Sequence, residues 1–497
     1  MRRLGLLLVL AAGCALGPDY KRPATQPPSS YRGGADTADP TSLADQDWAQ
    51  VFPDPALADL IHVALAQNQD LLIAAVRIEQ GEAQLGITRA NQLPAVSLGI
   101  AGGRERSGAT RFTPPFTTNV IQGNVAASWE LDFWGKFRRA TEAARADLLA
   151  AEWNRRAVIT SLIASIAGAY YQLLALDLEL EISQRTLTSR QESLQLTQVQ
   201  ERQGAVSLLD VRQAEQLVYN AAQTILDVQR RSEQEENFIS VLLARNPGPI
   251  ARGHKLIEQP HDPVVPAGLP SALLQRRPDI QLQEARLIAA NARIGVARAA
   301  FFPSISLTGA AGVQSAALSD LFKGPAGMWS FIGSLTQPIF EGGRLSSGVK
   351  LAEAQQKEAL IVYQQTIQQA FREVSDALVG YRKGREFREQ QELLANSTRD
   401  ALSLSEQRYR GGAASYLEVL DSNTRTFAAE LGLAQAQLNE LLSLVQLYDA
   451  LGGGWQHVPA SMVAETRRTD GECHAKPESR SRVEGQFDPG QRATRCR

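Results

Sequence analysis

Cys14 is the residue of this chain that is best placed for covalent chemistry, because its thiol follows a short apolar leader. Arg2 and Arg3 give the leader a positive start, and the nine residues 4–12 that come next are apolar. This order of charge, apolar run and small residues is the layout of a secretory signal. Nine residues are too few to cross a bilayer, which takes about 20. The sequence therefore predicts an export signal at residues 1–13, directly before the thiol.

The stretch LAAGCALGP at residues 10–18 resembles the lipobox of bacterial lipoproteins. In such a motif the thiol carries a diacylglyceryl group, the chain is cut before the cysteine, and the new amine is acylated. Several acyl chains make an anchor of this kind stable. The resemblance implies lipid attachment at Cys14, and Ala15, in place of the usual retention aspartate, implies the outer membrane of a Gram-negative bacterium. Ala11 replaces the usual leucine, and an ordinary signal peptide with an incidental cysteine is the alternative.

No other residue type is arranged for catalysis or metal binding. None of the five histidines has an H-E-x-x-H partner or a cysteine at metal-ligand spacing, and neither G-x-S-x-G nor a glycine-rich phosphate loop occurs. The histidines are His62, His254, His261, His457 and His474. The formal net charge of −2 creates no field that would attract nucleic acid. We therefore expect no enzyme, no cofactor, no metal site and no nucleic-acid partner.

The body of the chain consists of two similar copies. Residues 70–103 align with residues 279–312 without a gap, and eleven of the aligned positions are identical. RQGAVSLLDV at 202–211 matches RGGAASYLEV at 410–419 in six of ten positions. A fixed separation between similar segments is the mark of an internal repeat, here of about 208 residues. Both copies are therefore expected to be built in the same way.

Each copy is expected to begin with a helix and to continue with two strands. The opening helices, 55–91 and 270–300, are rich in good helix formers and stop before a proline. Val96, Leu98 and Ile100 then alternate with small polar residues, which is the period of a half-buried strand. The predicted strands are about 95–103, 119–134, 303–312 and 328–340. The predicted divisions are the signal 1–13, an extended arm 14–54, the first repeat 55–244, a linker 245–269, the second repeat 270–455 and a disordered tail 456–497.

The remainder of each copy is predicted to be long helix. Residues 137–202 contain one glycine and no proline, and leucines recur every seven residues from Leu173 to Leu194, as in a coiled-coil seam. Residues 344–410 repeat this pattern. Shorter helices are predicted to return at 207–243 and 415–450. Residues 158–176 carry no charge, so a transmembrane helix is an alternative, but their Ser, Thr and Gln side chains favour a buried helix in a bundle.

Four strands with one apolar face are too few for a closed membrane barrel. Backbone groups without partners cost several kcal/mol each in lipid, so every strand edge inside a membrane must be paired. The smallest membrane barrels have about eight strands. If the apolar face meets lipid, the chain must share a barrel with further copies, and Ser97, Gly99 and Ala101 then face a water-filled lumen. A soluble sheet packed on the helices is the alternative.

Seven motifs occur in order between Cys14 and Trp455: CALGPDYKRP, SWELDFWGKFRRA, LPSALLQRRPDI, FFPSISLTG, FEGGRL, RYRGGAASYLEVLDSNTR and ALGGGW. On these motifs the chain resembles the TolC-type outer membrane factor family, in the lipoprotein branch of multidrug efflux subunits (NodT/OprM-like). The resemblance implies an α+β membrane protein that forms a homotrimer. Three chains would share one twelve-stranded β-barrel in outer membrane lipid and one tunnel of long coiled-coil helices through the periplasm. A periplasmic membrane-fusion adaptor and an inner-membrane RND pump are the implied partners.

The resemblance also implies where the channel is closed. In this family, carboxylates after a motif like SYLEVLD narrow the periplasmic mouth, which places Asp421 at the constriction. Arg425 lies four residues on, on the same helical face, where the family often has a basic residue at the third place. Tyr409 stands before the turn and is expected to bond across helices. A solvated ion pair is the alternative interpretation of Asp421 and Arg425.

The strand pattern and the resemblance together imply an outer membrane channel subunit of a tripartite efflux system, conducting drugs or other small molecules. Two alternatives remain open at this point. One is a channel of the same kind for type I protein secretion, and the other is a lipid-anchored coiled-coil scaffold without a pore. Aromatic residues near the strand ends, such as Trp129, Trp134 and Trp329, favour a membrane interface over the scaffold.

Overall fold

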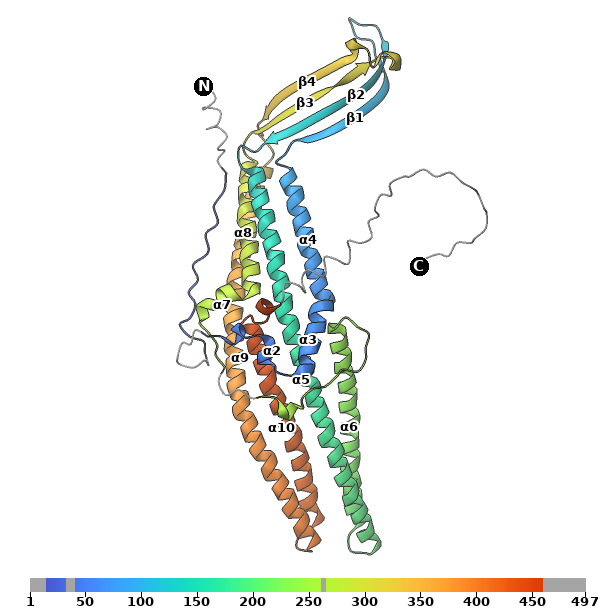
Figure 1. Ribbon diagram of the computed structural model, residues 1–497, viewed down its shortest axis with the longest axis vertical. Helices are drawn as coiled ribbons and strands as arrows, with labels where there is room; N and C mark the ends of the chain where they lie inside the picture. Colours follow the sequence, from blue (N-terminus) through green and yellow to red (C-terminus); the bar gives the residue numbers. More distant parts are fainter. Residues whose placement is uncertain (1–14, 33–40, 261–264, 459–497) are drawn as a thin grey trace, which may run out of the picture. The chain divides into compact units, whose positions relative to one another are not determined.

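The computed structural model describes residues 15–32, 41–260 and 265–458. The helices and strands named below belong to the unit Met1–His457 (Figure 1). The predicted signal and Cys14 lie outside the described residues, as does the predicted tail beyond Val458.

The two repeats fold into the same series of elements. In each copy a helix of 22 residues leads into two strands, a helix of 67 residues and a helix of 35 residues. The first copy consists of α4 (Gln69–Ala90), β1 (Ala95–Ser107), β2 (Phe116–Leu131), α5 (Lys136–Arg202) and α6 (Leu208–Leu242). The second consists of α8 (Pro278–Ala299), β3 (Ser304–Ser315), β4 (Gly327–Thr336), α9 (Arg344–Arg410) and α10 (Tyr416–Ala450). The equal helix lengths support the internal duplication.

Shorter helices lie before, between, within and after the two series. They are α2 (Trp48–Val51), α3 (Pro55–Gln67), α7 (Pro270–Arg276) and the 3-10 helices Leu43–Asp45, Leu256–Glu258, Leu318–Asp320, Gly324–Ala326 and Trp455–His457. The opening helices predicted at 55–91 and 270–300 are therefore each broken in two. Asn68 ends α3 and caps α4, because its Oδ1 accepts hydrogen bonds from the amides of Asp70 (2.9 Å) and Leu71 (3.1 Å). Arg277 separates α7 from α8, since a residue before a proline is driven out of the helical conformation.

The strands depart from their predicted bounds mainly at the ends. β1 continues beyond residue 103 to Ser107. β2 stops at Leu131 rather than at residue 134, because Asp132 turns to cap α5 and accepts bonds from the amides of Phe137 (3.0 Å) and Arg138 (2.8 Å). β4 stops at Thr336 rather than at residue 340, since the proline at position 338 has no N–H to give to a ladder.

The four strands form one antiparallel sheet in the order β1-β2-β3-β4. The middle pair, β2 and β3, joins the first repeat to the second. Within the described part of the chain, β1 and β4 are hydrogen-bonded on one side only. The sheet continues from the ends of α4, α5, α8 and α9 (Figure 1). It therefore has two open edges, one contributed by each repeat.

The sheet has two chemically different faces. Residues that oppose each other in an antiparallel ladder lie on the same face, and the register pairs Leu98 with Val125 and Ala311 with Trp329. The apolar face is formed by Val96, Leu98, Ile100, Val125, Ala127, Trp129, Ile305, Leu307, Ala311, Trp329, Phe331 and Leu335. The opposite face carries Ser97, Gly99, Ala101, Asn124, Ala126, Ser128, Ser306, Thr308, Ala310 and Ser334. Its exceptions are the charged Glu105 and Glu130 and the apolar Val120, Met328 and Ile332. Ile100 and Trp329 are each 81% exposed, so nothing in the described chain covers the apolar face at these positions.

α5 is the central helix of the bundle and packs against α4, α6, α8 and α10. It is the one helix in the described ranges that is long and apolar enough to cross a membrane. However, 61% of its apolar window is buried in the protein, and Ile163, Ile166 and Leu173 have no exposed surface. Core helices pass the same test of length and composition, so burial favours the interpretation of a bundle helix.

The heptad seam of α5 is more polar than the leucine pattern predicts. Leu180, Leu187 and Leu194 are only half-buried. The most buried series lies three residues after the predicted one and consists of Leu176, Ser183, Arg190 and Thr197, each 2% exposed or less. Polar side chains therefore occupy core positions toward the far end of α5.

The described part of the predicted arm contacts both repeats, at the start of α5 and along α8. The amide of Leu16 donates to the Trp134 carbonyl (3.1 Å), and the Tyr20 hydroxyl donates to Glu284 Oε1 on α8 (3.1 Å). The backbone of the arm approaches α8 so closely that a Cβ on Gly295 would lie 2.6 Å from the Leu16 carbonyl oxygen. Farther on, the arm is not purely extended, because it contains the 3-10 helix that begins at Leu43 and the helix α2.

Candidate functional site

The two long hairpins, α5–α6 and α9–α10, end in turns at the side remote from the sheet (Figure 1). Gly204 and Gly412 occupy matching places in these turns, and both have a φ of +74°, which favours glycine. Ser207 caps α6 through a capping box with Asp210. Ser415, at the matching place before α10, makes no side-chain cap bond. The two turns therefore share a backbone shape but differ in how firmly the returning helix begins.

Asp421 and Arg425 form an ion pair on the exposed face of α10. Arg425 Nε lies 2.8 Å from Asp421 Oδ2, and the two side chains are 71% and 58% exposed, respectively. The sequence therefore identified two side chains that do meet on one helical face. An isolated exposed pair contributes only about 0.3–0.5 kcal/mol to stability. A larger contribution of this ion pair requires charged neighbours from other chains. The constriction at Asp421 stays a prediction.

Tyr409 lies between the hairpins rather than beside that ion pair. Its hydroxyl donates to Gln200 Oε1 on α5 (2.6 Å), and its ring lies 5.5 Å from the ring of Tyr416. Burial, helped by the nearby Asp210 carboxylate, raises the pKa of Tyr409, so the hydroxyl stays protonated and able to donate. In the described chain no hydrogen bond joins Tyr409 to Asp421. Of the three predicted gate residues, the fold thus brings two together and places the third in a separate contact.

A buried arginine that the sequence analysis did not single out lies next to these residues. Arg190 on α5 is 2% exposed, and its Nε donates to Asn423 Oδ1 on α10 (2.7 Å). Its Nη1 donates to the Leu217 carbonyl on α6 (2.8 Å). The heptad pattern contains the signal that would have found it, because Arg190 lies three residues after Leu187, at a core position of the seam.

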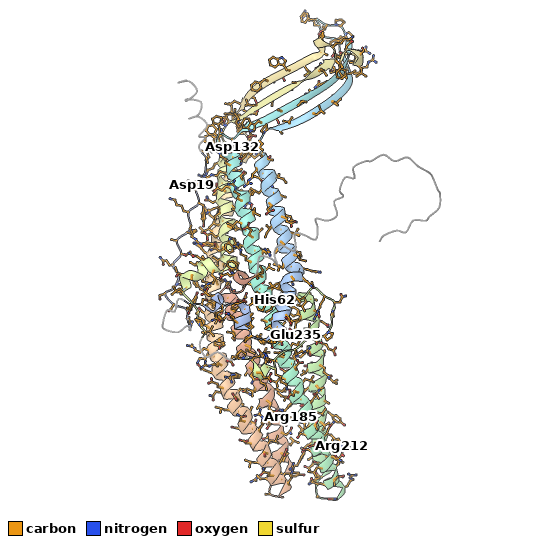
Figure 2. The ribbon with its side chains drawn as sticks, viewed as in Figure 1. Asp19, His62, Asp132, Arg185, Arg212 and Glu235 are labelled. Atoms are coloured by element: carbon orange, nitrogen blue, oxygen red, sulfur yellow. The ribbon has the colours of Figure 1, made fainter. Side chains whose placement is uncertain are left out.

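A second polar cluster joins the same helices farther from the turns. Glu430 on α10 lies between two arginines, with Arg185 Nη2 of α5 at 2.8 Å and Arg399 Nε of α9 at 2.6 Å. A cavity of about 300 Å³ adjoins this cluster and is also lined by Asn423 and Phe427. Figure 2 shows Arg185 on the part of the helices that leads to the hairpin ends. Charged side chains thus hold α5, α9 and α10 together at this level.

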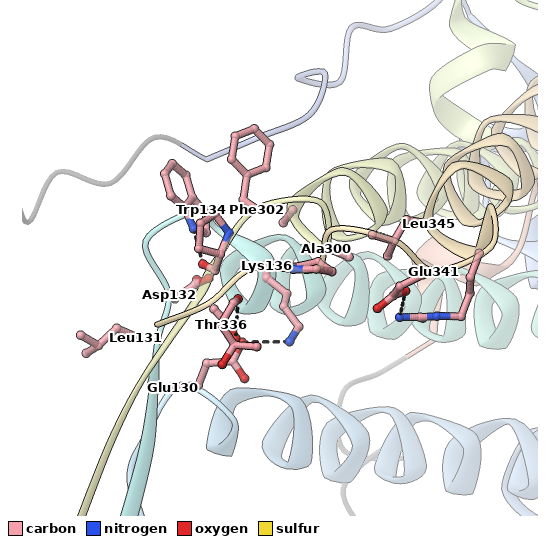
Figure 3. Close-up of a pocket in the computed structure, with 15 residues that line it drawn as sticks. Glu130, Leu131, Asp132, Trp134, Lys136, Ala300, Phe302, Thr336, Glu341 and Leu345 are labelled. Atoms are coloured by element: carbon pink, nitrogen blue, oxygen red, sulfur yellow. Dashed lines mark hydrogen bonds and ion pairs between the residues drawn. The ribbon is translucent and has the colours of Figure 1, made fainter. Parts of the chain in front are cut away.

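Another cavity, of about 340 Å³, lies where the sheet meets the helices (Figure 3). Trp134 Nε1 donates to the Pro303 carbonyl (2.7 Å), and its ring lies 4.8 Å from the ring of Phe302. Lys136 forms an ion pair with Glu130 (3.0 Å) in the same cavity. Aromatic rings beside charged groups are typical of the boundary between membrane and water. This composition fits a sheet that ends at a membrane surface.

The histidines and carboxylates of the described ranges surround no candidate metal centre. Among the described residues, no group of three or more His, Cys, Asp and Glu side chains could hold a metal ion. The ring of His62 packs edge-on against Trp48 at 5.0 Å, and His254 Nδ1 lies 4.0 Å from Glu258. Each of these two histidines thus has an ordinary contact with a neighbouring side chain. The candidate site is instead the set of contacts between helices described above.

Comparison with known proteins identifies the family. A family model described as outer membrane efflux protein matches residues 60–245 and 269–453, which is one match for each repeat. The probable efflux pump outer membrane protein TtgC of Pseudomonas putida is 38% identical over 466 residues, covering 91% of this chain and 95% of the relative. The outer membrane protein OprJ of Pseudomonas aeruginosa is 36% identical over 463 residues, covering 90% of this chain and 95% of the relative.

A solved structure gives the same answer. The open state of the MtrE outer membrane channel of Neisseria gonorrhoeae matches with a TM-score of 0.80 at 32% identity, covering 89% of this chain and 99% of that chain. The predicted family and the predicted combination of shared strands and long helices are both confirmed. This chain is a member of the outer membrane efflux protein family.

Proposed function

We propose that three copies of this chain form the outer membrane channel of a tripartite efflux system that exports small molecules. The observation that carries the proposal is the four-stranded sheet with one apolar face and two open edges. In lipid, the unpaired backbone groups of β1 and β4 must find partners. If β4 of one copy pairs with β1 of the next, a ring of three copies closes with twelve strands, and no edge remains.

The long helices continue the channel away from the membrane. α5 and α9 have 67 residues each, which corresponds to about 100 Å at 1.5 Å per residue. Their hairpin ends carry leucines that are more than half exposed, at Leu208, Leu209 and Leu417. Such apolar side chains suit contact with another protein. We assign this end to a periplasmic adaptor, which connects the channel to an inner-membrane RND pump.

The mainly small and polar lining of the barrel suits a conduit rather than a selective site. Ser97, Asn124 and Ser306 lie on the face opposite to the lipid-facing side chains, together with glycine and alanine. Small side chains leave room for a water-filled passage, and the charged Glu105 and Glu130 lie toward the two ends of the strands. The choice of drug or other small molecule therefore belongs to the pump, and this chain conducts what it receives.

Asp421 and Arg425 are assigned to the closed end of the tunnel. Both side chains are more than half exposed in the single chain, so they are available to neighbours in a trimer. Three symmetry-related pairs around one axis would bring six charged groups together. Charges in a narrow mouth are screened less by salt than isolated surface pairs, so their rearrangement would accompany opening.

The lipid anchor is assigned to Cys14. That residue lies outside the described part of the chain, but Leu16 bonds to the backbone of Trp134 next to the end of β2. The first described residues of the arm are therefore held where the sheet meets the helices. A lipid chain attached two residues earlier would enter the membrane beside the barrel.

Native mass spectrometry of the detergent-extracted mature protein tests the assembly. We expect a mass of three chains, each with acyl groups on Cys14, and ion conductance after reconstitution into a planar bilayer. A single chain that does not conduct would overturn the channel, because four strands cannot close a barrel. Trimers without acyl groups would leave the channel in place and remove the anchor.

A further inference from the structure

The interface between the two hairpins contains a positive charge that no carboxylate neutralises. The Arg190 guanidinium donates to Asn423 Oδ1 (2.7 Å), to the Leu217 carbonyl (2.8 Å) and to Asn220 Oδ1 (3.4 Å), all of which are neutral acceptors. Its Cζ lies 4.8 Å from the centre of the Phe427 ring. No ion pair joins Arg190 to an acidic side chain in the described ranges of the chain. Burial lowers the pKa of Arg190 to about 10, so the side chain stays charged near neutral pH.

This contact differs in its chemistry from the neighbouring one along α10. Glu430 is held by two arginines through charge-assisted bonds at 2.8 Å and 2.6 Å. The guanidinium of Arg190 is also an ionised donor, but its amide acceptor carries no opposite charge. Of these two polar links between α5 and α10, the one nearer the turns therefore depends on a single buried acceptor of α10, Asn423.

Asn423, which binds Arg190, and Asp421, the predicted gate residue, lie on opposite faces of the same turn of α10. Asn423 is 8% exposed and faces the interface with α5, whereas the side chain of Asp421 is 58% exposed. Residues two apart on a helix point about 200° away from each other. A shift of α10 relative to α5 at this level must therefore also move Asp421.

We propose that Arg190 is a positioning residue of the gate, which holds α10 through Asn423 so that Asp421 stays at the closed mouth. The inference rests on the proposed channel function and on the assignment of Asp421. Arg190 is bound to α6 as well as to α10, so it joins the first hairpin to the helix that carries the gate. When the Asn423 contact breaks, the guanidinium keeps its acceptors on α6, and α10 is free to move outward.

Three variants at two positions test the inference by single-channel recording in planar bilayers. Asn423→Asp keeps the shape of the side chain and gives Arg190 a carboxylate, so we expect lower conductance and fewer openings than in the wild type. Asn423→Leu removes the acceptor, and we expect conductance to rise several-fold. Asn220→Asp is the matched control, because it offers the same charge to the same arginine from α6. This new carboxylate does not bind Arg190 to α10, so the conductance of the closed state should not fall.

The direction of these effects separates positioning from a merely structural role. If Asn423→Asp and Asn423→Leu change thermal stability but leave conductance as in the wild type, the inference is overturned. It is also overturned if Asn220→Asp closes the channel as strongly as Asn423→Asp. Asn423→Asp keeps the test decisive if the leucine variant does not assemble, because it adds a favourable ion pair.

Asp421→Ala, recorded in parallel, separates this inference from the proposed function. A wild-type protein that forms no channel overturns the proposed function itself. Conductance that rises with Asp421→Ala but does not respond to either Asn423 variant overturns only the role of Arg190. An unchanged conductance in Asp421→Ala removes the gate, and with it the residue that positions it.

Discussion

The Tyr409 hydroxyl donates a hydrogen bond to Gln200 Oε1 at 2.6 Å, and the two residues are 209 positions apart, about one repeat length. Nearly equivalent places in the two copies therefore touch each other just before their turns. The bond links α9 to α5, and the ring contact of Tyr409 with Tyr416 adds α10. The two hairpins are thus joined close to the ends that we assign to the periplasmic mouth.

Tyr409→Phe removes this bond and keeps the ring contact. We expect a loss of about 0.5–1.5 kcal/mol in the free energy that holds the hairpins together, and a higher conductance of the closed channel. Planar bilayer recording measures the effect. Tyr219→Phe on α6 is a suitable control, since Tyr219 is 68% exposed. Equal conductance in both variants would contradict a role for Tyr409 in closure.

Asp421→Ala removes the carboxylate from the assigned constriction. We expect a higher conductance, because the ring of charges at the mouth is lost. Asp227→Ala breaks another ion pair with both side chains more than half exposed, the one with Arg230 on α6, and serves as the control. If both variants conduct like the wild type, Asp421 is an ordinary surface residue.

Asp449 makes the stability of the bundle depend on pH. Burial raises its pKa from 3.8 to about 6, with Glu373 and Asp279 acting in the same direction and Arg277 opposing them. Because the folded pKa lies above the unfolded one, the ionised form destabilises the fold, and this penalty is present above pH 6 and absent below about pH 4. The penalty at neutral pH is about 3 kcal/mol.

Asp449→Asn should remove that penalty. We expect a higher midpoint of thermal unfolding than in the wild type at pH 7.5, and a difference that shrinks as the pH falls from about 6 to 4. Circular dichroism of the helices in detergent follows the transition. A difference that is the same at every pH would show that Asp449 does not titrate in this range.

Gly295→Ala should detach the arm from α8. A Cβ at this position would lie 2.6 Å from the Leu16 carbonyl oxygen and 2.8 Å from Arg139 Cγ. Overpacking of this kind costs about 1–3 kcal/mol, and trypsin should then cut faster at Lys21. Gly86 aligns with Gly295 in the first repeat and has no atom within 4 Å of its added Cβ, so Gly86→Ala is the control. Similar cleavage of the two variants would argue against a docked arm.

Cys14→Ser should abolish acylation without loss of the fold, because the described contacts of the arm begin after that residue. Intact-mass measurement of the extracted protein reports the acyl groups directly. Cys473→Ser, which removes another of the three thiols, should leave the lipid in place. Retained acyl groups on the Cys14→Ser protein would contradict the anchor assignment.

The architecture of the repeats could be predicted because it depends on local patterns. α5 begins one residue before the predicted start at 137 and ends at the predicted residue 202, since no proline occurs between the two glycine turns. The strands follow from the alternation at Val96, Leu98 and Ile100, which also assigns their faces.

The features that the sequence did not predict depend on contacts between residues that are distant in the sequence. The break at Asn68 needs a cap bond, and helix propensity does not reveal such bonds. Arg190 reaches the core because Asn423 and Leu217 supply acceptors from other helices. For the gate, the spacing of Asp421 and Arg425 was enough to place them on one face, but their neighbours in an assembly are not encoded in any local pattern.

The near equality of the two copies has a consequence for docking partners. Three chains with two hairpins each would place six similar ends around one axis, a quasi-equivalent ring inside a threefold assembly. The ends alternate in character, because α6 starts with the Ser207 capping box and α10 starts without a side-chain cap. A partner could therefore bind as a ring of six on similar surfaces, or as a ring of three that chooses one kind of end. Duplication followed by divergence has thus given the two hairpin ends different helix starts, and Asp421 lies on the helix that begins without a side-chain cap.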